Sequence, residues 1–213
     1  MPKTKSEALR QLGAAIDADI SLWTIEESVS QLLDLVPRRQ VYEKEIQRFK
    51  SLKRQKEWLA TRALFYSTES GQASITYQAN GAPCLQGAAH SFISISHSQQ
   101  YVCLLLAAHP ATVDLETFSP KAWALKEKFM NEKEADAPAA VPPEQWATTI
   151  WSAKESVYKI AALPDLRFKE DIILSLQGNG DERRLLAELP QYNREYEVRY
   201  LYFPDFVLTV CQE

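Results

Sequence analysis

Residues 101–116 constrain the fold more than any other segment, because a wholly apolar run is followed at once by an alternating one. Residues 101–108 are apolar throughout, which is typical of a strand buried on both faces. In residues 111–116 the side chains of a strand would alternate, so Asp114 and Glu116 would share one face while the intervening apolar side chains enter a core. We therefore predict consecutive strands, the second being a central strand that ends in two carboxylates, where ligands gather in open sheets.

A second charged group lies in residues 151–159, Trp-Ser-Ala-Lys-Glu-Ser-Val-Tyr-Lys. In a helix, Glu155 and Lys159 are one turn apart on one face, and the apolar residues around them place the charged side chains at the rim of a core. If this helix docks beside the strand, Glu155 joins the two carboxylates at a divalent cation and Lys159 lies near a phosphate. Taken singly, each group is equally compatible with a solvated face.

The segment Ser96-His97-Ser98 follows an alternating strand and precedes a turn. This pattern predicts a small polar corner that can bind phosphate. A Ser/His nucleophilic pair is the competing interpretation. Sequence neighbours on a strand point to opposite faces, and no Gly-x-Ser-x-Gly motif is present, so we favour the phosphate corner.

The chain has 213 residues, of which 46% are hydrophobic and 10% aromatic, enough to fill the core of one large domain or two small ones. A net charge of −4 argues against a general nucleic-acid binder. The three cysteines are far apart, so we expect free thiols in a reducing compartment, with no disulfide and no structural zinc. No segment resembles a signal peptide or a membrane span, and we expect a cytoplasmic, monomeric enzyme.

The element pattern predicts an α+β protein made of two similar halves, residues 1–110 and 111–213. After the first strand, a helix is expected from Glu26. Further helices are expected over 38–70, which is a long basic stretch, and over 121–135 and 143–162, before the last strands. Strands are expected at 18–25, 74–78, 92–96, 101–108, 111–116, 171–177, 195–203 and 205–211, with turns at Asn80-Gly81 and 178–181.

Five motifs in this order resemble a known family: residues 56–64, 80–83, 92–98, 112–116 and 151–159. With them the chain resembles the surfactin-type 4′-phosphopantetheinyl transferases of the holo-acyl-carrier-protein synthase superfamily. The last two motifs are the specific ones. The resemblance implies a pseudo-twofold pair of similar α/β halves with coenzyme A bound in an active-site cleft between them.

The resemblance also implies roles for individual residues. Asp114, Glu116 and Glu155 match the ligands of Mg²⁺, with Mn²⁺ as an alternative, and hard oxygen ligands suit such a cation. Lys159 matches a pyrophosphate-binding lysine, and Lys154 the lysine before the metal-binding glutamate. Ser96 and His97 match a contact to the coenzyme phosphates. Ala82 stands where the family has a lysine, and we expect Arg62, Lys56 or Arg54 to take over that contact.

The implied reaction moves the 4′-phosphopantetheine arm of coenzyme A to a serine of an apo acyl or peptidyl carrier protein and releases 3′,5′-ADP. Glu155 or a metal-bound water is the candidate base, and Lys159 and His97 are expected to stabilise the developing charge. The basic stretch Arg48 to Arg62 is a candidate steering surface for an acidic carrier. Two rivals stay open: a Mg²⁺-dependent phosphatase or pyrophosphatase, and a non-catalytic module that binds coenzyme A or a carrier.

Overall fold

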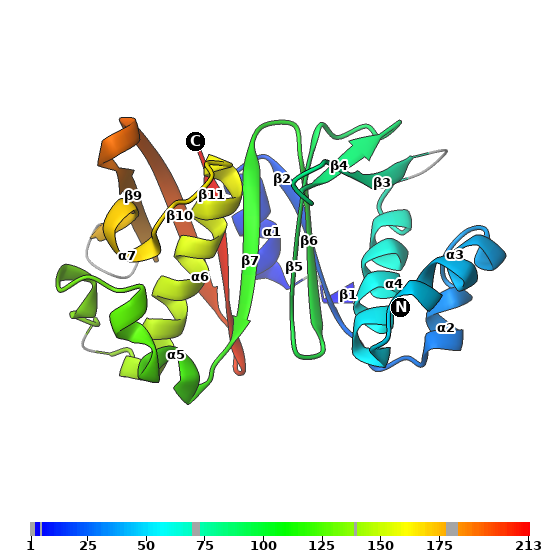
Figure 1. The fold of residues 1–213 in the computed structure, drawn as a ribbon, viewed down its shortest axis with the longest axis horizontal. Helices are drawn as coiled ribbons and strands as arrows, with labels where there is room; N and C mark the ends of the chain where they lie inside the picture. Colours follow the sequence, from blue (N-terminus) through cyan, green and yellow to red (C-terminus); the bar gives the residue numbers. More distant parts are fainter. Residues whose placement is uncertain (1–2, 5, 70–72, 139, 178–182) are drawn as a thin grey trace. The chain divides into compact units, whose positions relative to one another are not determined.

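The computed structural model describes residues 3–4, 6–69, 73–138, 140–177 and 183–213. The chain divides into two compact units, residues 1–109 and 110–213 (Figure 1). Helices and antiparallel sheets occur in both units, which confirms the α+β class. In the described part of the chain, no helix is both long and apolar enough to cross a bilayer.

The first unit contains a four-stranded antiparallel sheet in the order β1-β2-β6-β5 and a separate hairpin, β3-β4. The predicted apolar strand is β6, which lies between β2 and β5 and is buried along its whole length. The predicted turn at Asn80-Gly81 is confirmed: Gly81 has φ +85, and the Ala82 N–H donates to Asn80 Oδ1 at 3.0 Å. The strand bounds are β1 Lys3–Thr4, β2 Ala18–Thr24, β3 Ser74–Tyr77, β4 Pro83–Gln86, β5 Phe92–Ser98 and β6 Tyr101–Ala107.

The helices of the first unit differ from the prediction in one important way. The single basic helix expected over 38–70 is wrong: the chain forms α3 (Arg39–Glu45), η1 (Ile46–Arg48) and α4 (Leu52–Tyr66). The break falls at Phe49, whose backbone is extended, and Ser51 then caps α4 through its side chain. Apolar side chains of α4 pack on the sheet and form the core of this unit. The remaining helices are α1 (Glu7–Ala15), which was not predicted, and α2 (Val29–Leu33), which begins at the Ser28 capping box.

The second unit is built on a five-stranded antiparallel sheet in the order β7-β11-β10-β9-β8. The predicted acidic strand is β7. One strand, β9, was not predicted, and the predicted turn at 178–181 lies outside the described residues. The bounds are β7 Ala111–Thr117, β8 Ile173–Gln177, β9 Arg184–Leu189, β10 Arg194–Tyr202 and β11 Phe206–Gln212.

The long helix of the second unit, α6 (Pro143–Ala161), confirms the predicted helix at 143–162. It starts at a proline and ends where Ala162 takes a left-handed conformation, and its apolar face packs on the sheet. The helix expected over 121–135 is wrong, because only a short helix and two 3-10 turns form there. These are α5 (Pro120–Ala124), η2 (Lys126–Lys128) and η3 (Lys133–Ala135), and they are followed beyond α6 by α7 (Phe168–Asp171) and η4 (Pro190–Tyr192).

Candidate active site

The acidic face of β7 lies against α6, as the alternating pattern predicts. Ser152 Oγ donates a hydrogen bond of 2.8 Å to Asp114 Oδ2, and Trp151 Nε1 donates one of 3.3 Å to Glu116 Oε1. Both helix residues come from the same turn of α6, so each carboxylate of the strand has a donor on the helix. Thr112, on the same face of β7, donates to the Ser156 carbonyl at 2.7 Å and ties the strand to the next turn.

Lys159 joins this cluster from the following turn of α6. Its ammonium donates to Asp114 Oδ1 at 2.8 Å and to the Val113 carbonyl at 3.0 Å. A lysine carries three N–H bonds, so these contacts leave one for a further acceptor. The side chain is 28% exposed, which makes that third bond accessible to a phosphate oxygen.

Glu155 is the third carboxylate of the predicted set. Burial raises the pKa of Glu155 to about 7, and repulsion from Asp114 and Glu116 acts in the same direction while Lys159 opposes it. Among the described residues no group donates a hydrogen bond to this carboxylate. Its two oxygens are therefore available for a ligand that brings positive charge.

The donor set suits a hard divalent cation, since all three side chains offer carboxylate oxygens in a partly buried, mutually repulsive group. The three carboxylates do not form a complete coordination shell for a metal ion in this structure. Within the described ranges, no three His, Cys, Asp or Glu side chains are grouped closely enough to hold a metal ion. Asp114 is instead paired with Lys159 and Ser152, so a cation would have to compete with Lys159 for that carboxylate.

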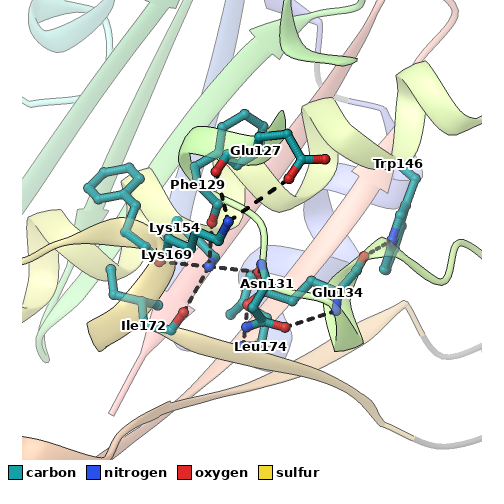
Figure 2. A network of polar contacts seen from close by, with 10 residues as sticks. Glu127, Phe129, Asn131, Glu134, Trp146, Lys154, Lys169, Ile172 and Leu174 are labelled. Carbon is teal, nitrogen blue, oxygen red and sulfur yellow. Dashed lines mark hydrogen bonds and ion pairs between the residues drawn. The ribbon is translucent and has the colours of Figure 1, made fainter. Parts of the chain in front are cut away.

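Lys154 is placed differently from its expected role at the coenzyme. Its side chain is 0% exposed and lies within the second unit, beside Phe129, Glu134 and Ile172 (Figure 2). The ammonium donates to the carbonyls of Phe129 and Phe168 at 2.7 Å and of Ile172 at 2.8 Å, and it forms an ion pair of 2.8 Å with Glu134. With three N–H bonds and four oxygen partners, it has no hydrogen left for a phosphate. We therefore assign Lys154 a structural role.

Glu134, the partner of Lys154, is itself surrounded by donors. Its carboxylate accepts from the backbone N–H of Asn131 at 2.9 Å and of Leu174 at 2.8 Å, and its carbonyl accepts from the Trp146 indole at 2.8 Å (Figure 2). Burial lowers the pKa of Lys154, and the Glu134 carboxylate counters that effect. These hydrogen bonds, one local and two to later segments of the chain, explain why residues 126–135 leave the predicted helix.

In the first unit, Arg62 of α4 lines a hollow of about 160 Å³. Its guanidinium lies 3.4 Å from the centroid of the Trp58 ring and donates to the Trp58 carbonyl and the Tyr77 hydroxyl, each at 3.2 Å. Burial lowers the pKa of Arg62. A guanidinium has five N–H bonds, and in the part of the chain that the structure describes no carboxylate pairs with this one. This hollow therefore offers a buried positive charge to an anion.

The other predicted phosphate contacts are only partly gathered at this hollow. His97 lines it, with Nε2 2.6 Å from Arg54 Nη1 and Nδ1 3.8 Å from Glu57 Oε2. Ser96 is buried and Lys56 half-buried, and neither belongs to the lining. Arg54 thus accompanies Arg62 and His97, whereas Lys56 does not.

A family model matches most of the second unit. The model of the 4′-phosphopantetheinyl transferase superfamily matches residues 111–211. This part of the chain is therefore similar to that superfamily. The match supports a transferase, with phosphopantetheinyl transfer as its general activity and with coenzyme A and a carrier protein as its partners. No curated protein matches the chain significantly.

The residues that match this family model contain β7 and α6, and hence all three predicted carboxylates and Lys159. The sequence prediction missed two of the residues that hold the strand carboxylates, Trp151 and Ser152. Helical spacing could have indicated them, because Glu155 follows them by four and three residues, so all three lie near one face of α6.

Proposed function

We propose that the protein is a surfactin-type 4′-phosphopantetheinyl transferase that requires Mg²⁺, or alternatively Mn²⁺. It would transfer the phosphopantetheine arm of coenzyme A to a serine of an apo acyl or peptidyl carrier protein. The observation that carries the proposal is the half-buried Glu155 carboxylate, which has no donor among the described residues and is repelled by Asp114 and Glu116. The family match over residues 111–211 supports the reaction class.

Asp114, Glu116 and Glu155 would hold the cation, which would supply positive charge to the pyrophosphate of coenzyme A. Lys159, the ammonium next to Asp114, would donate an N–H to a phosphate oxygen. In the transfer, the serine oxygen forms a bond to the phosphorus of the pantetheine phosphate, and the bridging P–O bond breaks. The electron pair of that bond leaves with 3′,5′-ADP.

The attacking serine must lose its proton during this step. Glu155, or a water held at the cation, is the candidate base for this proton. Arg62, Arg54 and His97 of the first unit would bind other phosphate oxygens of the coenzyme. In this proposal Arg62 takes over the contact that is missing at Ala82.

The carrier would be attracted by the basic residues that precede and begin α4. Arg48, Lys50, Lys53 and Arg54 are exposed, and the first turn of α4 contains no acidic residue to complement the helix dipole. Such a surface favours an acidic partner and accelerates its association at low salt. A carrier KM that does not change between low and high salt would contradict this role.

The reaction can be tested by intact-mass measurement of an apo carrier protein after incubation with coenzyme A and Mg²⁺. We expect a gain of one phosphopantetheine group on a serine, and loss of this gain with a chelator or in the Asp114→Ala and Glu155→Ala variants. Glu144→Ala is the matched control, since Glu144 lies exposed at the start of the same helix. Release of inorganic phosphate without a mass gain would instead indicate a phosphatase, and coenzyme A binding without either product would indicate a non-catalytic module.

A further inference from the structure

We propose that Trp151 is a positioning residue for Glu116 and that Lys154 sets the place of Trp151 through the backbone of two flanking phenylalanines. The inference rests on the proposed function, because it assigns Glu116 to a cation site. It adds two residues to that site, neither of which would touch the cation or the coenzyme.

The first link is the hydrogen bond of 3.3 Å from Trp151 Nε1 to Glu116 Oε1. An indole has one N–H and no acceptor, so Trp151 can serve Glu116 only as a donor. A donor on one carboxylate oxygen orients the other oxygen. Residues that hold metal ligands in this way typically change metal affinity when they are removed.

The second link is the pair of phenylalanine rings that pack against the Trp151 indole. The Phe129 ring lies edge-on to it, with centroids 5.2 Å apart and planes at 71°, and the Phe168 ring lies 5.3 Å away on a tilted plane at 39°. Tyr158, about two helical turns further along α6, contacts Phe168, with ring centroids 5.7 Å apart. The indole therefore has ring neighbours from two segments that lie outside its own helix.

The third link is Lys154, which holds both of those segments. Its ammonium donates to the carbonyls of Phe129 and Phe168, the two residues whose rings contact Trp151. Because the ammonium has no freedom left inside its cage, the two backbones are fixed relative to α6. The network of Figure 2 is thus connected through two rings to the Glu116 carboxylate.

The sharpest test is Trp151→Phe in the full chain, because a phenyl ring can stay between the two phenylalanines but cannot donate to Glu116. Mn²⁺ binding is measured by titration calorimetry without coenzyme A. We expect the Kd for Mn²⁺ to rise by about 10-fold to 100-fold, while the melting temperature changes little. Trp123→Phe is the control, since the Trp123 ring lies against the Lys126 ammonium and, within the described residues, its indole donates no hydrogen bond to the three carboxylates.

A double-mutant cycle tests the link from Lys154. The pair of substitutions Lys154→Met and Glu134→Gln removes both buried charges together and should weaken Mn²⁺ binding in the wild-type background. In the Trp151→Phe background the same pair should cause little further loss, because the indole is the route of its effect. Equal losses in the two backgrounds would overturn the role of Lys154.

The outcomes separate this inference from the proposed function. If the wild-type chain binds Mn²⁺ and Trp151→Phe binds it equally well, the positioning role is overturned while the function stands. If the wild-type chain binds no Mn²⁺, the cation site and the positioning role both fall. If Trp151→Phe binds Mn²⁺ more weakly and Trp123→Phe does not, the positioning role is supported. The Trp151→Phe measurement tests the positioning role of Trp151 even if the variant with Lys154→Met and Glu134→Gln fails to fold.

Discussion

The protein buries two positive charges, Lys154 in the second unit and Arg62 in the first. Their surroundings stabilise them in opposite ways. The Lys154 side chain is 0% exposed and is surrounded by three carbonyls and a carboxylate. Arg62 is 4% exposed, yet its described partners are a carbonyl, a phenol and the face of an indole. Arg62 also lines a hollow, whereas the ammonium of Lys154 lies in a closed cage of protein oxygens.

The difference shows that burial alone does not identify a functional charge. A charge whose hydrogen-bonding capacity is used up contributes to folding, because removing its partner leaves the opposite charge stranded. A buried charge that lies beside a hollow and has unused hydrogen-bonding capacity can bind a ligand. On this basis we assign Lys154 to the scaffold of the second unit and propose that Arg62, in the first unit, contacts the coenzyme.

The largest effect is expected from Lys154→Met, which leaves Glu134 buried without its counter-ion. We expect a loss of about 3–5 kcal/mol in the free energy of unfolding, measured by urea denaturation. Adding Glu134→Gln should recover most of this loss, since an amide oxygen can still accept from the Leu174 N–H. A loss below about 1 kcal/mol for Lys154→Met would mean that the pair is not the structural element described here.

A smaller effect on stability, but a clear one on binding, is expected from Arg62→Met. No buried carboxylate is stranded, so the free energy of unfolding should change by about 1 kcal/mol or less. Coenzyme A should bind about 10-fold to 100-fold more weakly in a calorimetric titration, the cost of losing a hydrogen bond from a charged donor. Arg48→Met is the control, because the Arg48 guanidinium also lies over the Trp58 ring, at 5.3 Å, but does not line the hollow. Unchanged coenzyme affinity in Arg62→Met would contradict the proposal that Arg62 binds coenzyme A.

The smallest effect is expected from Lys56→Ala. Lys56 is next to the hollow in sequence but is absent from its lining, so coenzyme affinity should stay within about twofold of wild type in the same titration. A loss as large as that of Arg62→Met would show that Lys56 reaches the coenzyme and that the lining residues are an incomplete guide.

Much of the candidate site was predictable because it depends on local periodicity. Alternation along β7 placed Asp114 and Glu116 on one face, and helical spacing placed Glu155 and Lys159 on another; the structure brings these faces together. The role of Lys154 was not predictable in the same way. Lys154 is buried among carbonyls that lie 14 to 25 residues away along the chain. Helical or strand spacing in the sequence does not indicate contacts of this kind.

The fold was predictable to a similar extent. The apolar strand at 101–108 and the helix at 143–162 were found because long, strongly patterned segments leave few alternatives. The break in the helix predicted over 38–70 was missed, because the charged residues on both sides of Phe49 continue a helical pattern that one extended residue interrupts. The helix predicted over 121–135 failed partly for a tertiary reason. The Glu134 carboxylate accepts from the Asn131 N–H, which a helix would have used, and from the Leu174 N–H on β8.

The most direct test of the proposed site is a calorimetric titration of Mn²⁺ into the full chain, with and without coenzyme A. If the three carboxylates hold a cation that binds the coenzyme phosphates, coenzyme A should tighten Mn²⁺ binding, and Mn²⁺ should tighten coenzyme binding by the same factor. Glu155→Gln should weaken Mn²⁺ binding about 100-fold and remove this coupling, while Glu144→Gln on the same helix should leave both unchanged. Equal Mn²⁺ affinity and coupling in wild type and Glu155→Gln would contradict the assignment of this site.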